Sequence, residues 1–215
     1  MSELKIKNFI IKDLKPIRRN FKNKNNKFSA QGYLDTKKVK IYEIFDFKQG
    51  NLREFISNHK QLSNFFPKVL VFNERFIVEE WVDGKTLKEL NFTKSKIFPY
   101  EKNIRKIIEL MWSIKYNQIV FDYFGYIHKR INMNNNFNLE SIPIRVNHND
   151  LTLDNIILTS KGLKIVDNEF LGCSTGWIFN IINSFLKEDM KNQYFIPIKT
   201  FAELWEIRKK WSSWV

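Results

Sequence analysis

The residues most able to carry out chemistry lie in the stretch 146–158. His148, Asp150 and Asn155 stand there in the order H-x-D-x-x-x-x-N, directly before a short apolar run. Asp167 follows a second apolar run, and a Ser-Lys-Gly turn between the two runs predicts a β-hairpin. The pattern therefore gathers two carboxylates and an amide at one end of a hairpin.

These side chains have the chemistry that phosphoryl transfer needs. One carboxylate can orient an attacking hydroxyl and accept its proton. A second carboxylate and an amide oxygen can hold Mg²⁺, which prefers oxygen ligands. Two other interpretations compete with this one. A simple polar turn is the first, because Asp and Asn are common in turns. A calcium loop is the second, but the required Gly at its sixth position and Glu at its twelfth are missing.

The same residues resemble the catalytic segment of the protein-kinase-like superfamily. The similar branch holds aminoglycoside phosphotransferases, choline kinases and lipopolysaccharide-core sugar kinases. The resemblance implies that Asp150 is the catalytic base, that Asn155 and Asp167 bind Mg²⁺, and that His148 braces the catalytic loop. It also implies ATP as the phosphate donor and gives Glu169, in the Asp-x-Glu pattern, a supporting role.

The first half of the chain resembles the nucleotide-binding lobe of these kinases. Lys40 matches the strand lysine that touches the α- and β-phosphates, and Lys38, two residues earlier on the same strand face, is the alternative. Glu54 on the following helix matches the ion-pair partner of that lysine. Glu80 and Val82 match the strand end and hinge under which adenine lies.

One segment departs from the family pattern. Residues 18–24 read Arg-Arg-Asn-Phe-Lys-Asn-Lys, where related kinases carry a glycine-rich phosphate loop, and they contain no glycine. Basic side chains could hold the nucleotide phosphates there. A loop that closes poorly would instead make the chain a pseudokinase or a nucleotide-binding regulatory module, which is the alternative function.

Apolar periodicity predicts the elements that must position these residues. Strands are expected at 5–12, 28–34, 38–45, 69–72, 76–81, 156–158 and 163–166. Helices are expected at 51–62, 86–90, 100–117, from 176 to 186, and at 201–215. The fold class is α+β with two lobes, a mainly-β lobe at residues 1–82 and a mainly-α lobe at 83–215 that contains the catalytic hairpin.

Composition limits the partners and the compartment. The 215 residues carry a formal charge of +13, and 15% of them are aromatic, but no recognised nucleic-acid motif is present, so no specific nucleic acid is expected. The single cysteine excludes an internal disulfide framework, and no signal peptide or membrane span is evident, which predicts a cytoplasmic protein.

The expected acceptor is a small molecule or a glycan, with bacterial surface glycan or lipopolysaccharide synthesis as the narrower hypothesis. The positive charge and a Trp-rich basic stretch at 205–214 suggest peripheral contact with the anionic inner face of a membrane. Packing of that stretch on its own domain is the competing interpretation.

Overall fold

The computed structural model describes residues 3–17, 28–91, 98–122 and 143–175. The chain separates into two compact units, and each is described by itself. The first unit comprises residues 1–85 and 157–169, and the second comprises residues 86–156 and 170–215. The catalytic hairpin, which the sequence prediction assigns to the second lobe, is therefore grouped largely with the first unit.

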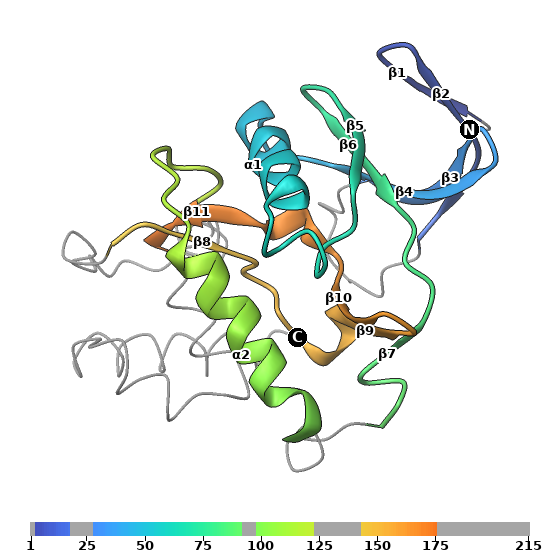
Figure 1. Cartoon of the computed structure of the whole chain (residues 1–215). Helices are drawn as coiled ribbons and strands as arrows, with labels where there is room; N and C mark the ends of the chain where they lie inside the picture. The colour runs from blue at the N-terminus through green and yellow to red at the C-terminus, as the bar shows by residue number, and fades with distance from the viewer. Residues whose placement is uncertain (1–2, 18–27, 92–97, 123–142, 176–215) are drawn as a thin grey trace, which may run out of the picture. The chain divides into compact units, whose positions relative to one another are not determined.

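A six-stranded antiparallel sheet dominates the first unit (Figure 1). Its strand order is β1-β2-β3-β4-β6-β5. The strands are β1 (Glu3–Ile6), β2 (Phe9–Pro16), β3 (Ser29–Leu34), β4 (Lys37–Glu43), β5 (Val69–Phe72) and β6 (Phe76–Glu80). The single strand predicted at 5–12 is wrong, because the chain reverses at Lys7, whose φ is 54°, and forms the β1–β2 hairpin. The turn contains no glycine or proline that would mark it in the sequence.

The sheet has apolar residues on both faces because side chains alternate along each strand. One buried cluster includes Ile11, Val39, Ile41 and Val78. A second buried cluster includes Tyr42, Ile77 and Phe72, which alternate with the first set. Consecutive buried residues, Ile41 and Tyr42 in β4 and Phe76 to Val78 in β6, follow from this burial on two sides.

Helix α1 (Phe47–Asn58) follows β4 and begins four residues before the predicted start at 51. Asp46 is its N-cap, and the Asp46 carboxylate accepts a hydrogen bond from the backbone N–H of Gln49. Apart from the exposed Phe47, the first turn is polar and contains Gly50, so the apolar periodicity that signals a helix starts only at Leu52. A cap, and not a hydrophobic stripe, therefore sets the beginning of this helix.

In the second unit, helix α2 (Phe98–Ser113) buries the apolar residues of the predicted stripe, which are Ile104, Ile107, Ile108, Met111 and Trp112. The helix ends four residues before the predicted end at 117, and Lys115, which was also predicted to be buried, lies beyond it and is exposed. Two short strands pair in antiparallel fashion, β8 (Arg145–Asn147) and β11 (Gly172–Ser174). The sequence prediction missed both strands. Three residues are too few for a period of two to be recognised.

The helix predicted at 86–90 is wrong. Thr86 ends the two-residue strand β7 (Lys85–Thr86), and a single turn follows up to Asn91. Thr86 and Glu89 exchange reciprocal side-chain-to-backbone hydrogen bonds, Thr86 N–H to Glu89 Oε2 at 2.7 Å and Glu89 N–H to Thr86 Oγ1 at 3.0 Å. This is the pairing of a helix capping box. Asn91 has a φ of 56°, which stops the chain from continuing as a helix.

The predicted catalytic hairpin is present as β9 (Ile156–Thr159) and β10 (Gly162–Ile165). Gly162 forms its turn with a φ of 110°, a conformation that favours glycine. The hairpin belongs to a three-stranded sheet of order β10-β9-β7. Two 3₁₀ turns flank the hairpin, η1 (Leu153–Asn155) before it and η2 (Asn168–Phe170) after it.

No helix among residues 3–17, 28–91, 98–122 and 143–175 is long and apolar enough to cross a membrane. The helices predicted from 176 to 186 and at 201–215 lie outside the described residues.

Candidate active site

The loop between β8 and β9 holds Asp150 with its backbone fixed on both sides. The Asp150 N–H donates to Nδ1 of His148 at 3.3 Å, and His148 is fully buried. The Asn155 side-chain amide donates to the Asp150 carbonyl oxygen at 2.7 Å and to Asp150 Oδ2 at 3.1 Å. The structure thus brings together the three residues of the H-x-D-x-x-x-x-N pattern, and the Asp150 carboxylate remains partly exposed.

Two buried asparagines that the sequence prediction did not single out support this loop. Asn147 Nδ2 donates to Asn149 Oδ1 at 2.6 Å, and Asn149 Nδ2 donates to the Phe170 carbonyl at 2.8 Å. Asn147 Oδ1 also accepts from Trp112 Nε1 on α2, at 3.4 Å. Asn149 has a φ of 67°, a region that asparagine tolerates better than most residues. In the sequence, asparagines flank His148 on both sides, and this pattern could have indicated that both side chains support the loop.

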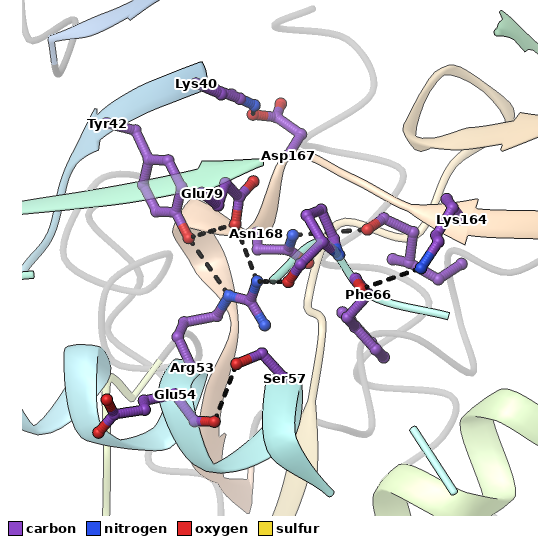
Figure 2. Close-up of polar contacts among 12 residues, drawn as sticks. Lys40, Tyr42, Arg53, Glu54, Ser57, Phe66, Glu79, Lys164, Asp167 and Asn168 are labelled. Atoms are coloured by element: carbon purple, nitrogen blue, oxygen red, sulfur yellow. Dashed lines mark hydrogen bonds and ion pairs between the residues drawn. The ribbon is translucent and has the colours of Figure 1, made fainter. Parts of the chain in front are cut away.

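Asp167 lies directly beyond the hairpin and forms an ion pair with Lys40 of β4. Lys40 Nζ is 2.9 Å from Asp167 Oδ1, and the side chains are 14% and 26% exposed (Figure 2). The two residues are 127 positions apart in the chain. Tertiary structure within the first unit therefore brings together the predicted phosphate lysine and a predicted metal ligand.

The alternative phosphate lysine, Lys38, lies elsewhere on the strand. Its Nζ lies 3.9 Å from the centroid of the Trp81 ring, in cation–π geometry. Lys40 and not Lys38 is the lysine that reaches Asp167. The sequence did not decide which of the two lysines matches the phosphate lysine of kinases, and the geometry favours Lys40.

The ion pair expected between Lys40 and Glu54 does not form in the structure. The Glu54 side chain is exposed on α1 and points away from Lys40 and Asp167 (Figure 2). The charged residue of this helix turn that faces inward is Arg53, which is fully buried, and its Nη2 lies 2.8 Å from Glu79 Oε2 on β6. Helical geometry explains the difference, because consecutive residues point about 100° apart around the axis.

Arg53, Tyr42 and Glu79 form a buried polar cluster, which we call the Arg53 cluster. Arg53 Nε donates to the Tyr42 hydroxyl at 3.3 Å, and that hydroxyl donates to Glu79 Oε2 at 3.2 Å. Burial, together with the Glu79 charge, raises the pKa of Tyr42 well above its usual value. The Tyr42 hydroxyl therefore stays protonated and available as a donor.

The residues expected near adenine lie where β6 ends. Glu80 is exposed, and its backbone N–H donates to the Lys68 carbonyl at 2.9 Å. Val82 is half-buried in the connection that leads to β7. Their contact with a nucleotide stays a prediction.

The predicted site residues fall into two groups. Lys40 and Asp167 belong to the first unit, and His148, Asp150 and Asn155 belong to the second. Within the described residues, no group of three or more His, Cys, Asp or Glu side chains is close enough to hold a metal ion without other ligands.

The comparisons with solved structures address the fold. No protein-family model and no curated protein matches the sequence. The structure is similar to aminoglycoside phosphotransferase APH(2'')-IIa in complex with streptomycin and ATP, with a TM-score of 0.58, 14% identity, and 90% of this chain and 81% of that chain covered. This chain has the protein-kinase-like fold.

Two further solved structures agree with this fold. Aminoglycoside phosphotransferase APH(4)-Ia has a TM-score of 0.54 and 9% identity, with 86% of this chain and 78% of that chain covered. Ethanolamine kinase from Plasmodium vivax has a TM-score of 0.50 and 16% identity, with 89% and 66% covered. The predicted kinase-like fold class is thus confirmed, and these similar structures are small-molecule kinases, the branch that the sequence resembles.

Proposed function

We propose that this chain is an ATP-dependent phosphotransferase that moves the γ-phosphate of ATP to a hydroxyl group of a small molecule. The observation that carries the proposal is the ion pair of Lys40 with Asp167 on a kinase-like fold. A lysine and a carboxylate at this distance can act on the same bound triphosphate, the lysine directly and the carboxylate through a cation. The catalytic loop around Asp150 supplies the second half of the argument.

Asp150 is suited to act as the base that receives the proton of the acceptor hydroxyl. Its carboxylate is partly exposed, so an acceptor can approach it. The hydrogen bond from Asn155 to Oδ2 fixes the direction of the carboxylate. His148 and Asn155 hold the backbone at Asp150, and Asn155 also holds its carboxylate. The base is therefore already oriented before the reaction.

The chemistry of the proposed ligands fits Mg²⁺. Asp167 presents a carboxylate, and the Asn155 amide donates through its nitrogen to Asp150, which directs the amide oxygen away from that contact. Hard oxygen donors of this kind are the ligands that Mg²⁺ takes in phosphate sites. When bound, Mg²⁺ would neutralise charge on the β- and γ-phosphates. Asp167 would then exchange part of its interaction with Lys40 for the cation, which frees the lysine ammonium for phosphate oxygens.

The acceptor class rests on the neighbours and not on the site geometry. Solved neighbours bind streptomycin, gentamicin and hygromycin B, and one is an ethanolamine kinase. These support a small hydroxyl-bearing acceptor as the substrate class of this chain. The narrower hypothesis of a surface glycan or lipopolysaccharide saccharide stays a prediction.

The proposal is tested by following the transfer of labelled γ-phosphate to pools of aminoglycosides, amino alcohols, free sugars and lipid-linked glycans. Asp150→Asn should lower kcat by about 10²- to 10⁴-fold, the usual contribution of a general base. Its ATP affinity should stay within about 3-fold of wild type, because Asp150 is proposed to act on the acceptor.

The matched control is Asp154→Asn in the same loop. Asp154 is exposed, and among the residues that the structure describes its side chain forms a surface ion pair with Lys88 at 2.8 Å, so kcat should be unchanged. Transfer that survives Asp150→Asn at full rate contradicts the proposed role of Asp150. Nucleotide binding without transfer to any pool would instead favour the nucleotide-binding regulatory module.

A further inference from the structure

Gln49 joins the first turn of α1 to the segment that carries Asp167. Its side chain is fully buried, and its Nε2 donates to the backbone carbonyl of Glu169 at 2.6 Å. Its Oε1 accepts from the Phe45 N–H at 3.0 Å. One amide thus connects the β4–α1 junction with a carbonyl that is 120 residues away in the chain.

The helix that carries Gln49 is itself anchored to the sheet. Arg53 lies one turn further along α1, on the same side as Gln49, because residues i and i+4 share a helix face. Arg53 Nη2 is 2.8 Å from Glu79 Oε2 and donates to the Pro67 carbonyl at 3.4 Å. Figure 2 shows Arg53 reaching from α1 to Tyr42 and Glu79. Gln49 therefore projects from a helix whose position is fixed by a buried ion pair.

The segment that Gln49 contacts needs external support. Asp167 has a φ of 60°, in the left-handed region that residues other than glycine rarely adopt. Such a conformation persists where surrounding contacts determine it. Lys40 contacts the Asp167 side chain, and Gln49 contacts the backbone two residues later. Lys40 belongs to β4, and the Arg53 cluster that anchors α1 includes Tyr42 of the same strand.

We propose that Gln49 is a positioning residue that sets the direction of the Asp167 carboxylate by holding the Glu169 carbonyl. The effect on catalysis rests on the proposed function, but the effect on the segment itself does not. The competing role is purely local, since the Gln49 side chain also accepts a hydrogen bond from the Phe45 N–H at the start of α1. The two roles use different atoms of one amide, so substitutions can separate them.

Gln49→Glu is the discriminating variant. The carboxylate keeps an acceptor for the Phe45 N–H but removes the donor to the Glu169 carbonyl. Gln49→Met removes both hydrogen bonds at similar volume and serves if Gln49→Glu does not fold. Asn51→Asp is the matched control, because it makes the same amide-to-acid change at an exposed position of the same helix.

The first measurement is amide hydrogen exchange of the full-length, nucleotide-free protein. In Gln49→Glu, amides at 166–171 should exchange about 10-fold faster or more, while those at 50–58 keep their wild-type rates. The control Asn51→Asp should leave both segments unchanged. Unchanged exchange at 166–171, or equal acceleration in both segments, overturns the proposal in favour of a purely local role.

The second measurement is the affinity for ATP with Mg²⁺ and with EDTA. Gln49→Glu should weaken the Mg²⁺-dependent part of binding by about 10- to 100-fold, as is usual when a residue that orients a metal ligand is removed. Affinity in EDTA should stay within about 3-fold. Equal weakening in both conditions overturns the positioning role. A wild-type protein that binds no nucleotide refutes the proposed function, while the exchange result still decides whether Gln49 holds the segment.

Discussion

At the residue scale, the buried charged residue of α1 is Arg53, one position before Glu54, the acid that was expected to face inward. Family resemblance assigned Glu54 to Lys40, but Glu54 faces solvent and Lys40 pairs with Asp167. Arg53 takes the inward position and pairs with Glu79, with both side chains at most 1% exposed. Because a cation at 53, and not the acid at 54, faces inward, α1 is attached to Glu79 of β6 and not to Lys40.

The Arg53 cluster should be sensitive to loss of one partner. Arg53→Met should lower the free energy of unfolding by about 3 to 5 kcal/mol, because Glu79 would stay buried without its cation. Adding Glu79→Leu should restore much of that loss, since the uncompensated charge is removed. Urea denaturation of both variants measures these changes.

The control for this prediction is the neighbouring exposed acid. Glu54→Gln should change the free energy of unfolding by less than about 0.5 kcal/mol. An Arg53→Met variant as stable as Glu54→Gln would contradict the assignment of Arg53 as the anchor of α1.

Cys173 should make stability fall at alkaline pH. Burial raises the pKa of the Cys173 thiol to about 11, and its Sγ donates to the Tyr116 carbonyl at 3.7 Å. The folded state therefore holds this proton more tightly than the unfolded state, whose thiol has a pKa of about 8.5. The stabilisation is complete below about pH 8.5 and is lost as the pH rises toward 11.

Denaturation midpoints of wild type and Cys173→Ala between pH 7 and pH 10.5 measure this effect. The wild type should lose more stability than the variant above about pH 8.5, and native Cys173 should react slowly with iodoacetamide. Parallel pH profiles for the two proteins would show that Cys173 does not titrate differently on folding.

At the element scale, the position of α1 depends on close approach to the sheet. A Cβ built on Gly50 would lie 2.3 Å from Phe72 Cδ2 of β5, so the helix backbone packs directly on that ring. Phe72 also contacts Phe47 at 5.3 Å between ring centroids, which limits where the ring can move. Glycine at this helical position is explained by packing and not by backbone conformation.

Gly50→Ala should therefore destabilise the protein although alanine favours helices. Overpacking costs about 1 to 3 kcal/mol, which exceeds the gain of about 1 kcal/mol from helix propensity. A lower thermal midpoint for Gly50→Ala, partly restored by Phe72→Leu, is the expected result. A higher midpoint for Gly50→Ala alone would mean that the helix does not pack as closely as described.

At the scale of the whole molecule, the charge of +13 predicts nonspecific attraction to polyanions. We expect binding to anionic vesicles, RNA and DNA alike at about 50 mM salt, with nearly complete loss above about 200 mM, since several phosphate contacts give a steep salt dependence. Co-sedimentation with anionic and neutral vesicles measures it. Vesicle binding that persists at high salt, while nucleic-acid binding disappears, would support the predicted peripheral membrane contact.

Local patterns predicted much of the fold. The boundaries of β5 agree with the sequence prediction, and the hairpin of β9 and β10 lies within one residue of it, because a turn signal and an apolar run adjoin each other there. The β1–β2 turn, β8 and β11 were missed. The β1–β2 turn was missed because it contains no glycine or proline, and β8 and β11 were missed because three residues are too few to show a period.

The sequence by itself determined the catalytic loop, since His148, Asp150 and Asn155 are close in the chain and their contacts are local. Only tertiary structure decided that Lys40 and not Lys38 pairs with Asp167, that Arg53 and not Glu54 faces inward, and that Gln49 contacts the Glu169 carbonyl. These contacts depend on how strands and helix pack across the first unit. Spacing along the chain carries no information on which side chain of a helix turn faces inward when both neighbours are charged.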